Sequence, residues 1–476
     1  MVSLKDIRNI YFIGIGGIGM SAVARFFLSR NVRVSGYDKT ETPLTKQLVE
    51  EGAVIHYSDD VALLDKDAQL VVYTPAIPKN HLQWQWYLDH QYAVVKRSDV
   101  LQIITEDSFN ICIAGTHGKT STSTMVGHVL RHTGYGCNVF LGGISVNYET
   151  NFWSSANNVC VVEADEFDRS FLKLSPDIAV VSSMDADHLD IYGTVEKMED
   201  AFVEFTQRTK PGGLLIRKHN LKRLNNTPIK RQLTYQLAEQ VEHTHDHDDD
   251  HHHHDEEAAV DIFASNIRVV DGGYLFDAHV AGHVVPNIRL NVGGLHNIEN
   301  MLVAIAVAKS LKIADDKLIA AIADYKGVKR RFEYLHFGAD ALGNKQIAID
   351  DYAHHPEELR ALINSAKQLF PALPMTIVFQ PHLFSRTRDL AAEFAAVLSL
   401  ADRVVLLPIY PARELPMEGV SSYSIADKMD ASKVKVMEKQ DWLASLDTDK
   451  PALLITAGAG DIDALLPVVK EKLVMN

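Results

Sequence analysis

The sequence predicts an α/β chain of three domains, because apolar strands run into glycine-rich or charged turns and then into helices in three separate regions. Residues 9–13 lead into the glycine pattern 14–19, residues 111–114 lead into a second glycine turn at 115–118, and strands alternate with helices from 346 to 457. A length of 476 residues is sufficient for three separate cores. We expect domains at residues 1–107, 108–327 and 328–476.

The first domain opens with the pattern of a dinucleotide-binding unit. The strand at 9–13 is followed by G-x-G-x-x-G, a helix to residue 28 and a second strand at 32–37 that ends at Asp38. In such a Rossmann-like domain, loop amides hold a pyrophosphate and the acid binds a ribose hydroxyl. A third strand from residue 71 enters the loop at 74–78, at the expected ligand edge. A dehydrogenase shares this motif, but UDP-sugars also carry a pyrophosphate.

The second glycine turn has the pattern of a phosphate loop. Gly115 and Gly118 permit a tight turn, Lys119 adds a mobile positive charge, and Thr120 or Ser121 offers a hydroxyl to magnesium. The helix that follows directs its positive dipole end at the same point. Ile113 stands where the first glycine of the usual pattern would be, so the loop is two residues shorter. The pattern predicts a central domain of the P-loop ATPase type.

Two acidic clusters follow strands of this central domain. Residues 163–166 come after the strand at 158–162, and residues 185–190 come after the strand at 178–181. The carboxyl ends of parallel strands meet at one edge of a sheet, so both clusters should lie near the phosphate loop. Glu163 and His188 are therefore candidate magnesium ligands, whereas Asp187 and Asp190 are equally suited to capping a helix.

Polar residues also mark the remaining turns. The segment 293–300 precedes an apolar helix and either faces a nucleotide or caps that helix. Two arginines at 330–331 form either a solvated hinge or a contact to a γ-phosphate. Charged residues crowd the strand ends at 350–356, 380–389 and 458–461, as expected for a substrate site in a second Rossmann-like domain.

Composition excludes several classes of protein. The net charge is −15, and eight acids lie in the histidine-rich stretch 242–257, which we expect to be a solvated insert that binds metals opportunistically. The rest of the chain stays acidic, which argues against nucleic-acid binding. No apolar run reaches the roughly 18 residues of a membrane helix, and the first residues do not form a signal peptide. Cysteines at 112, 137 and 160 indicate a reducing, cytosolic compartment rather than a disulfide framework.

Taken together, the motifs resemble those of the Mur ligase family. Their segments occur in the family's order along nearly the whole chain: 14–20, 115–120, 163–166, 187–188, 296–297, 327–332, 350–356, 380–389 and 458–460. The resemblance implies a cytoplasmic, ATP-dependent ligase of peptidoglycan synthesis that requires Mg²⁺. It implies UDP-N-acetylmuramate and L-alanine as substrates, joined through an acyl phosphate.

The resemblance also implies roles for single residues. Those for the UDP-sugar are Gly14, Gly16, Gly17, Gly19, Met20, Asp38, Thr74 and Ala76. Those for ATP are Gly115, Thr116, His117, Gly118, Lys119, Thr120, Ser121, Asn297, Arg331 and Asp351, and those for magnesium are Thr120, Glu163 and His188. Those for alanine are Tyr352, His354, Arg386 and Arg388. Lys119, His188, Arg331, His354 and Arg386 would take part in catalysis, with either His188 or His354 as the general base.

Two positions depart from the family pattern, and two related functions stay open. Asp185 stands where the family often has glutamate, and Leu383 stands beside His382 where it usually has arginine. The loss of that arginine leaves Arg386 and Arg388 to hold a carboxylate. The open alternatives are a recycling ligase that joins UDP-N-acetylmuramate to a preformed tripeptide, and a nucleotide-binding regulatory protein without ligase activity.

Overall fold

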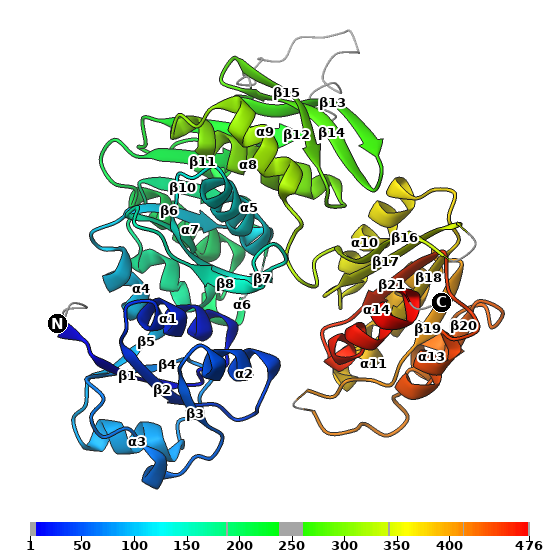
Figure 1. Cartoon of the computed structure of the whole chain (residues 1–476), viewed down its shortest axis with the longest axis horizontal. Coiled ribbons are helices and arrows are strands. Elements are labelled where there is room, and N and C mark those ends of the chain that lie inside the picture. Colours follow the sequence, from blue (N-terminus) through cyan, green and yellow to red (C-terminus); the bar gives the residue numbers. More distant parts are fainter. Residues whose placement is uncertain (1–5, 187–188, 238–259, 341–342, 413, 475–476) are drawn as a thin grey trace. The chain divides into compact units, whose positions relative to one another are not determined.

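The computed structural model describes residues 6–186, 189–237, 260–340, 343–412 and 414–474, and these form three sheets in an α/β arrangement (Figure 1). The predicted fold class is confirmed. The chain divides into two compact units: Met1–Asn266, Phe276–Ile288 and Ile298–Tyr325 form the first, and Ile267–Leu275, Arg289–Asn297 and Lys326–Asn476 form the second. The candidate ligand His188 and the stretch 242–257 lie outside the described residues.

The N-terminal sheet is fully parallel, in the order β3-β2-β1-β4-β5. Its strands are β1 (Asn9–Ile13), β2 (Arg33–Tyr37), β3 (Val54–His56), β4 (Leu70–Tyr73) and β5 (Val94–Lys96). Ile10 and Phe12 of β1 belong to the core shared with α1 (Ile18–Leu28) and α4 (Arg97–Thr105), while Tyr11 and Ile13 pack on the side of α3 (Leu82–Asp89). The glycine loop follows β1, where the strand order reverses and ligands bind in such sheets. Helix α2 (Pro43–Glu50) follows β2.

The central sheet has ten strands in the order β15-β14-β13-β12-β11-β10-β6-β9-β7-β8. At its centre, β6 (Phe109–Ala114) pairs in parallel with β10 (Ile178–Val181) on one side and β9 (Val159–Glu163) on the other. The outer strands are β7 (Asn138–Ser145), β8 (Thr150–Trp153), β11 (Leu214–Lys218), β12 (Gln232–Leu237), β13 (Ile262–Val270), β14 (Gly273–Val280) and β15 (His283–Leu290). The second glycine turn therefore also follows a strand flanked on both sides.

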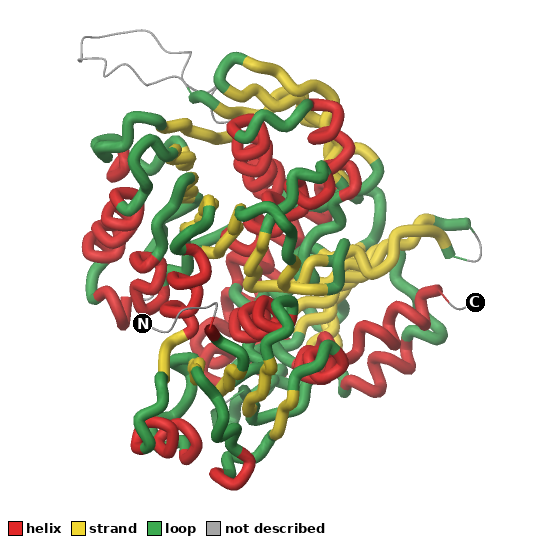
Figure 2. Tube along the Cα trace, turned by 60° about the vertical axis from the view of Figure 1, so that its left-hand side comes forward, coloured by secondary structure: helices red, strands yellow, loops and turns green. Residues whose placement is uncertain are grey.

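Helices cover the strands of this sheet (Figure 2). They are α5 (Lys119–His132), α6 (Leu189–Tyr192), α7 (Val195–Gln207), α8 (Leu295–Ser310) and α9 (Asp315–Asp324), and a 3₁₀ segment, η3 (Phe167–Lys173), follows β9. Helix α8 begins within the segment 293–300, which was predicted to precede it, and the Asn297 N–H donates to the Gly294 carbonyl in its first turn.

The N-terminal and central sheets share one apolar core within the first unit. The ring of Phe26 on α1 lies 5.7 Å from that of Phe140 and 6.2 Å from that of Phe152, which belong to β7 and β8. Beside them the buried Arg25 guanidinium donates to Asn151 and, at 2.7 Å, to the Glu51 carboxylate. This packing fixes the glycine loop after β1 relative to the phosphate loop after β6.

The third sheet has the order β16-β17-β21-β18-β19-β20 and is parallel except for its edge strand β16 (Glu333–Ala339). The other strands are β17 (Lys345–Asp351), β18 (Met375–Phe379), β19 (Arg403–Leu406), β20 (Val434–Val436) and β21 (Leu453–Ala457). Its helices are α10 (Pro356–Leu369), α11 (Phe384–Leu398), α12 (Tyr423–Ala426), α13 (Lys439–Ser445) and α14 (Leu466–Val474). Across the described ranges, no helix has the length and hydropathy needed to cross a bilayer.

Candidate active site

The phosphate loop joins β6 to α5 through two glycines in unusual backbone conformations. Gly115 has a φ angle of 140° and Gly118 one of 82°, which residues other than glycine rarely adopt. A Cβ atom on Gly115 would also lie 2.1 Å from Ser182 Oγ, so the end of β10 approaches too closely for any larger residue. The local sequence therefore specifies the tight curl that was predicted from it.

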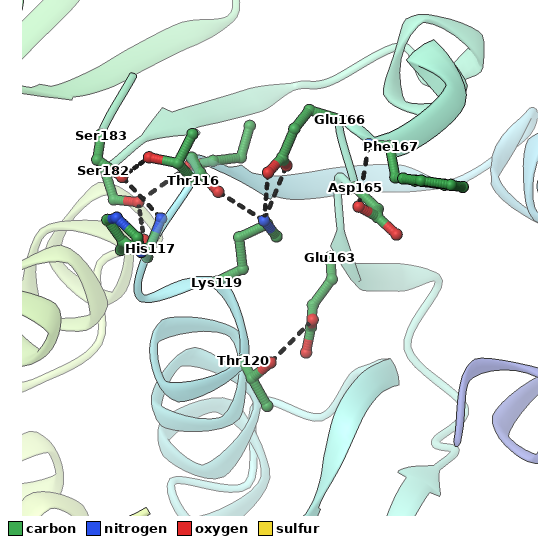
Figure 3. Close-up of polar contacts among 12 residues, drawn as sticks. Thr116, His117, Lys119, Thr120, Glu163, Asp165, Glu166, Phe167, Ser182 and Ser183 are labelled. Carbon is green, nitrogen blue, oxygen red and sulfur yellow. Dashed lines mark hydrogen bonds and ion pairs between the residues drawn. The ribbon is translucent and has the colours of Figure 1, made fainter. Parts of the chain in front are cut away.

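Two serines at the end of β10 brace this loop (Figure 3). Ser183 Oγ accepts a hydrogen bond from the His117 N–H at 2.8 Å and lies 2.9 Å from Thr116 Oγ1. Ser182 Oγ donates to the His117 carbonyl at 2.6 Å. The motif gave no functional role to either serine, although both stand in the polar run that follows the strand at 178–181.

Lys119 points back over the loop toward the end of β9 (Figure 3). Its Nζ donates to the Gly115 carbonyl at 2.7 Å and to both carboxylate oxygens of Glu166 at 2.8 Å. An ammonium group has three N–H donors, so these three acceptors can engage all of them. Glu166 is fully buried, and burial raises the pKa of its carboxyl group while Lys119 opposes that rise. Glu166 is thus the counter-ion of the phosphate-loop lysine, a role that the sequence did not reveal.

Thr120 and Glu163 lie beside Lys119, as the strand-end argument predicts. Thr120 Oγ1 donates to Glu163 Oε2 at 3.1 Å, and Glu163 Oε1 accepts from Ser123 Oγ at 3.0 Å and from the Gly142 N–H at 2.6 Å. A hydroxyl at the start of α5 and a carboxylate at the end of β9 suit magnesium, which prefers oxygen ligands and keeps several water or phosphate ligands of its own. Among the described residues, no cluster of three or more His, Cys, Asp or Glu side chains is assembled for a metal.

The N-terminal glycine loop is held by the end of β2. The Gly14 and Ile15 N–H groups donate to the Tyr37 carbonyl at 2.8 and 3.0 Å, and the Gly16 N–H donates to Asp38 Oδ2 at 2.7 Å. Asp38 therefore stabilises the loop itself, and its contact to a ribose stays a prediction. Among the other predicted residues, Gly17 caps α1, Met20 is buried and Ala76 is exposed.

A cavity of about 280 Å³ connects this loop with Glu163. Its walls come from both sheets of the first unit and include Gly17, Gly19, Met20, Thr74, Arg97, Leu141, Gly142, Glu163 and Asp165. The structure thus brings four of the eight predicted sugar-nucleotide residues, Gly17, Gly19, Met20 and Thr74, to one space with the predicted metal ligand. Arg97, which has no place in either glycine motif, was missed by sequence analysis.

The predicted residues of the second unit fall into two groups, the first of which consists of the candidate ATP contacts Asp351, Arg331 and Asn297. The Asp351 carboxylate accepts from the Phe332 N–H at 2.7 Å and from the Ala353 N–H at 2.8 Å, while burial raises its pKa to about 6. Arg331 is exposed and follows Arg330, whose backbone has φ 62°. Asn297 is buried and donates to the Gly293 carbonyl at 2.6 Å, as expected for a helix-terminal contact.

The second group gathers after β17 and β18. The ring of His354 lies 5.3 Å from that of Tyr352 and 5.9 Å from that of His382. Arg386 Nη1 is buried without a hydrogen-bond partner in the described part of the chain, and together with burial its charge lowers the pKa of His382. A buried guanidinium nitrogen without a partner, near the His382 ring, fits a small carboxylate ligand. Arg388 is exposed and pairs with Asp389 at 2.7 Å instead.

Comparison with known families assigns all three regions. Residues 9–108 match the model described as Mur ligase family, catalytic domain; residues 113–308 match the Mur ligase middle domain; and residues 330–460 match the Mur ligase, glutamate ligase domain. The chain belongs to the Mur ligase family. The resemblance seen in the motifs is therefore confirmed.

Several relatives match this Mur ligase over nearly their full length. The chain is 42% identical to UDP-N-acetylmuramate–L-alanine ligase of Flavobacterium johnsoniae, with all of both chains covered. It is 43% identical to the ligase of that name from Parabacteroides distasonis, over 99% of this chain and 98% of the other. Among solved structures it is similar to UDP-N-acetylmuramate-alanine ligase of Thermotoga maritima, with 26% identity, a TM-score of 0.79 and coverage of 97% and 98%.

Proposed function

We propose that this Mur ligase joins L-alanine to the carboxylate of UDP-N-acetylmuramate at the expense of ATP, and that it binds Mg²⁺. The observation that carries this function is the full-length similarity, at 42% identity, to ligases that carry this substrate pair in their name. The site agrees with it, since a phosphate loop, an oxygen-rich metal position and a second glycine loop lie in one unit.

The first chemical step must activate a carboxylate, which is a poor acylating agent. The γ-phosphoryl group of ATP transfers to a muramate carboxylate oxygen, which gives an acyl phosphate and ADP. Lys119 offsets charge on the phosphate groups, and the loop amides next to Gly115 and Gly118 orient them. Thr120 and Glu163 would hold the magnesium ion, which would supply positive charge to the phosphate oxygens.

The second step forms the amide bond. The alanine amine attacks the acyl carbon, the C–N bond forms, and inorganic phosphate leaves with the electrons of the C–O bond. An α-amino group titrates near pH 8, so a weak general base is sufficient to remove its proton. We assign the alanine carboxylate to Arg386, with Tyr352 and His354 as neighbouring contacts. His354 Nδ1 lies 3.0 Å from the Tyr352 carbonyl, which leaves Nε2 as the ring atom for proton transfer.

We propose ATP-binding roles for Asn297, Arg331 and Asp351 and a metal-binding role for His188 because their motifs match those of the family. A cytoplasmic location is part of the same proposal. Its support is the use of ATP together with three buried cysteines that are free thiols, as expected in a reducing compartment.

The decisive experiment measures ADP release and product mass with purified protein, ATP, Mg²⁺ and UDP-N-acetylmuramate. The added acceptor is L-alanine, glycine, L-serine or the tripeptide L-alanyl-γ-D-glutamyl-meso-diaminopimelate. We expect the largest kcat/KM and an amide-linked product with L-alanine. Preference for the tripeptide would instead assign the recycling reaction, and ATP hydrolysis that no acceptor changes would assign a regulatory role.

A further inference from the structure

The cavity between the N-terminal and central sheets has an unbalanced charge. Of its described lining residues, Glu163 and Asp165 are acidic and Arg97 is the one cation. The proposed substrate has a diphosphate and a carboxylate, so it would bring more negative charge into this space. A magnesium ion at Glu163 would neutralise part of that negative charge. Arg97 is the side chain placed to neutralise more of it.

Arg97 lies directly against the glycine loop. A Cβ atom built on Gly19 would lie 2.8 Å from Arg97 Nη1 and 3.1 Å from Cζ, so the guanidinium group covers the first turn of α1. This is the turn whose amides hold a pyrophosphate in dinucleotide-binding domains. Arg97 is the first residue of α4, a helix that follows β4 and β5 along the chain and so lies far from the glycine loop in sequence.

The guanidinium group is weakly engaged by the protein. Its ion-pair partner within the described residues is Asp165, with 3.9 Å between Nη2 and Oδ2, which exceeds hydrogen-bond distance. The side chain of Arg97 is 27% exposed, so ligand can reach it. The neighbouring Lys96 differs: its Nζ bonds Asp168 at 2.7 Å, and it does not line the cavity.

We propose that Arg97 binds the diphosphate of the sugar nucleotide and is a binding contact for the substrate of the first step. The planar guanidinium group offers two parallel N–H donors, which match two phosphate oxygens. This inference rests on the proposed function and names the residue that positions its substrate.

The test measures dissociation constants of UDP, UDP-N-acetylglucosamine and UDP-N-acetylmuramate by calorimetry, for the full chain and for the Arg97→Met variant. The first two ligands have the diphosphate without the carboxylate. We expect binding of all three to weaken by a similar factor, about 10- to 100-fold, because a charge-assisted pair of hydrogen bonds is lost. Arg97→Lys should recover only part of this affinity, since an ammonium lacks the two-pronged geometry.

Lys96→Met is the matched control. It removes a cation at the position next to Arg97, together with the ion pair that this lysine forms with Asp168. It should leave all three constants within about twofold. Unchanged binding in Arg97→Met, or an equal loss in Lys96→Met, would overturn the proposal. A loss confined to UDP-N-acetylmuramate would overturn the diphosphate assignment in favour of the carboxylate. Wild-type binding of the sugar nucleotide without alanine ligation would instead contradict the proposed function alone.

Discussion

Replacement of Glu166 by glutamine tests how the phosphate-loop lysine is controlled. In the structure Lys119 Nζ already has three acceptors, two of which are the oxygens of a buried carboxylate. A nucleotide phosphate must displace at least one of them and must also approach the negative charge of Glu166. Glu166→Gln retains the size of the side chain and removes that charge, so we expect ATP to bind more tightly.

The magnitude follows from the geometry. Lys119 Nζ lies 2.8 Å from each Glu166 oxygen, and a phosphate oxygen on its other side would bond at a similar distance, so the two anions would be about 5–6 Å apart. Two unit charges at that separation repel by about 3 kcal/mol at an effective dielectric constant of about 20. Weaker orientation of Lys119 in the variant offsets part of this, and a net gain of about 1 kcal/mol corresponds to roughly fivefold tighter binding.

The assay is calorimetric titration of ATP with Mg²⁺, without muramate or alanine. Asp168→Asn is the matched control, because it removes a carboxylate five residues after Glu163 that bonds Lys96 rather than Lys119. The control should bind ATP like the wild type. Equal or weaker ATP binding by Glu166→Gln, with UDP-sugar binding intact as a measure of folding, would refute the competition argument and make Glu166 a required partner of Lys119.

Three further predictions follow. Lys119→Ala should lower ATP turnover by at least about 10²-fold, measured as ADP release, because a preorganised cation at the phosphates is lost; near-normal turnover would remove the phosphate-loop assignment. Arg386→Leu should raise the KM for L-alanine about tenfold or more while the dissociation constant of ATP stays constant, and an unchanged KM would place the amino acid elsewhere. Burial lowers the pKa of His128 to about 4, so its contribution to stability is lost as the pH falls from about 6.5 toward 4, where only the unfolded chain binds the proton. His128→Gln should therefore flatten the fall in thermal midpoint between pH 7 and pH 5, and an equally steep fall would contradict this.

The parts of the site that could be predicted from the sequence are those with local causes. Gly115 and Gly118 have backbone angles that suit glycine, and the strand before them and the helix after them are visible in the apolar pattern. The meeting of Thr120 and Glu163 was also predictable, because parallel strands bring their carboxyl ends to the same edge. Domain-level motifs then named the family correctly.

What the sequence did not indicate depends on contacts between distant segments. Arg97 faces Gly19 because α4 and α1 pack on the same side of the N-terminal sheet, and an arginine at the start of a helix has no distinguishing pattern. Asp38 was predicted as a ribose ligand, whereas in the ligand-free chain it bonds the Gly16 amide across 22 positions. Such pairings are set by register and packing rather than by residue spacing.

Residues 163–168, at the end of β9 and directly after it, link the two halves of the first unit. Each of their four acids contacts a residue close to one of the two glycine loops. The pairs are Glu163 with Thr120, Asp165 with Arg97, Glu166 with Lys119, and Asp168 with Lys96. Two of these partners, Lys119 and Thr120, follow the phosphate loop at the start of α5, and the other two, Lys96 and Arg97, lie where β5 meets α4, beside the sugar-nucleotide cavity. An anion that displaces Glu166 from Lys119 therefore acts on the same six residues, 163–168, as an anion that draws Arg97 from Asp165. Because linkage is reciprocal, each substrate should change the affinity of the other by the same factor, and the Glu166→Gln and Arg97→Met variants should both reduce that factor toward one.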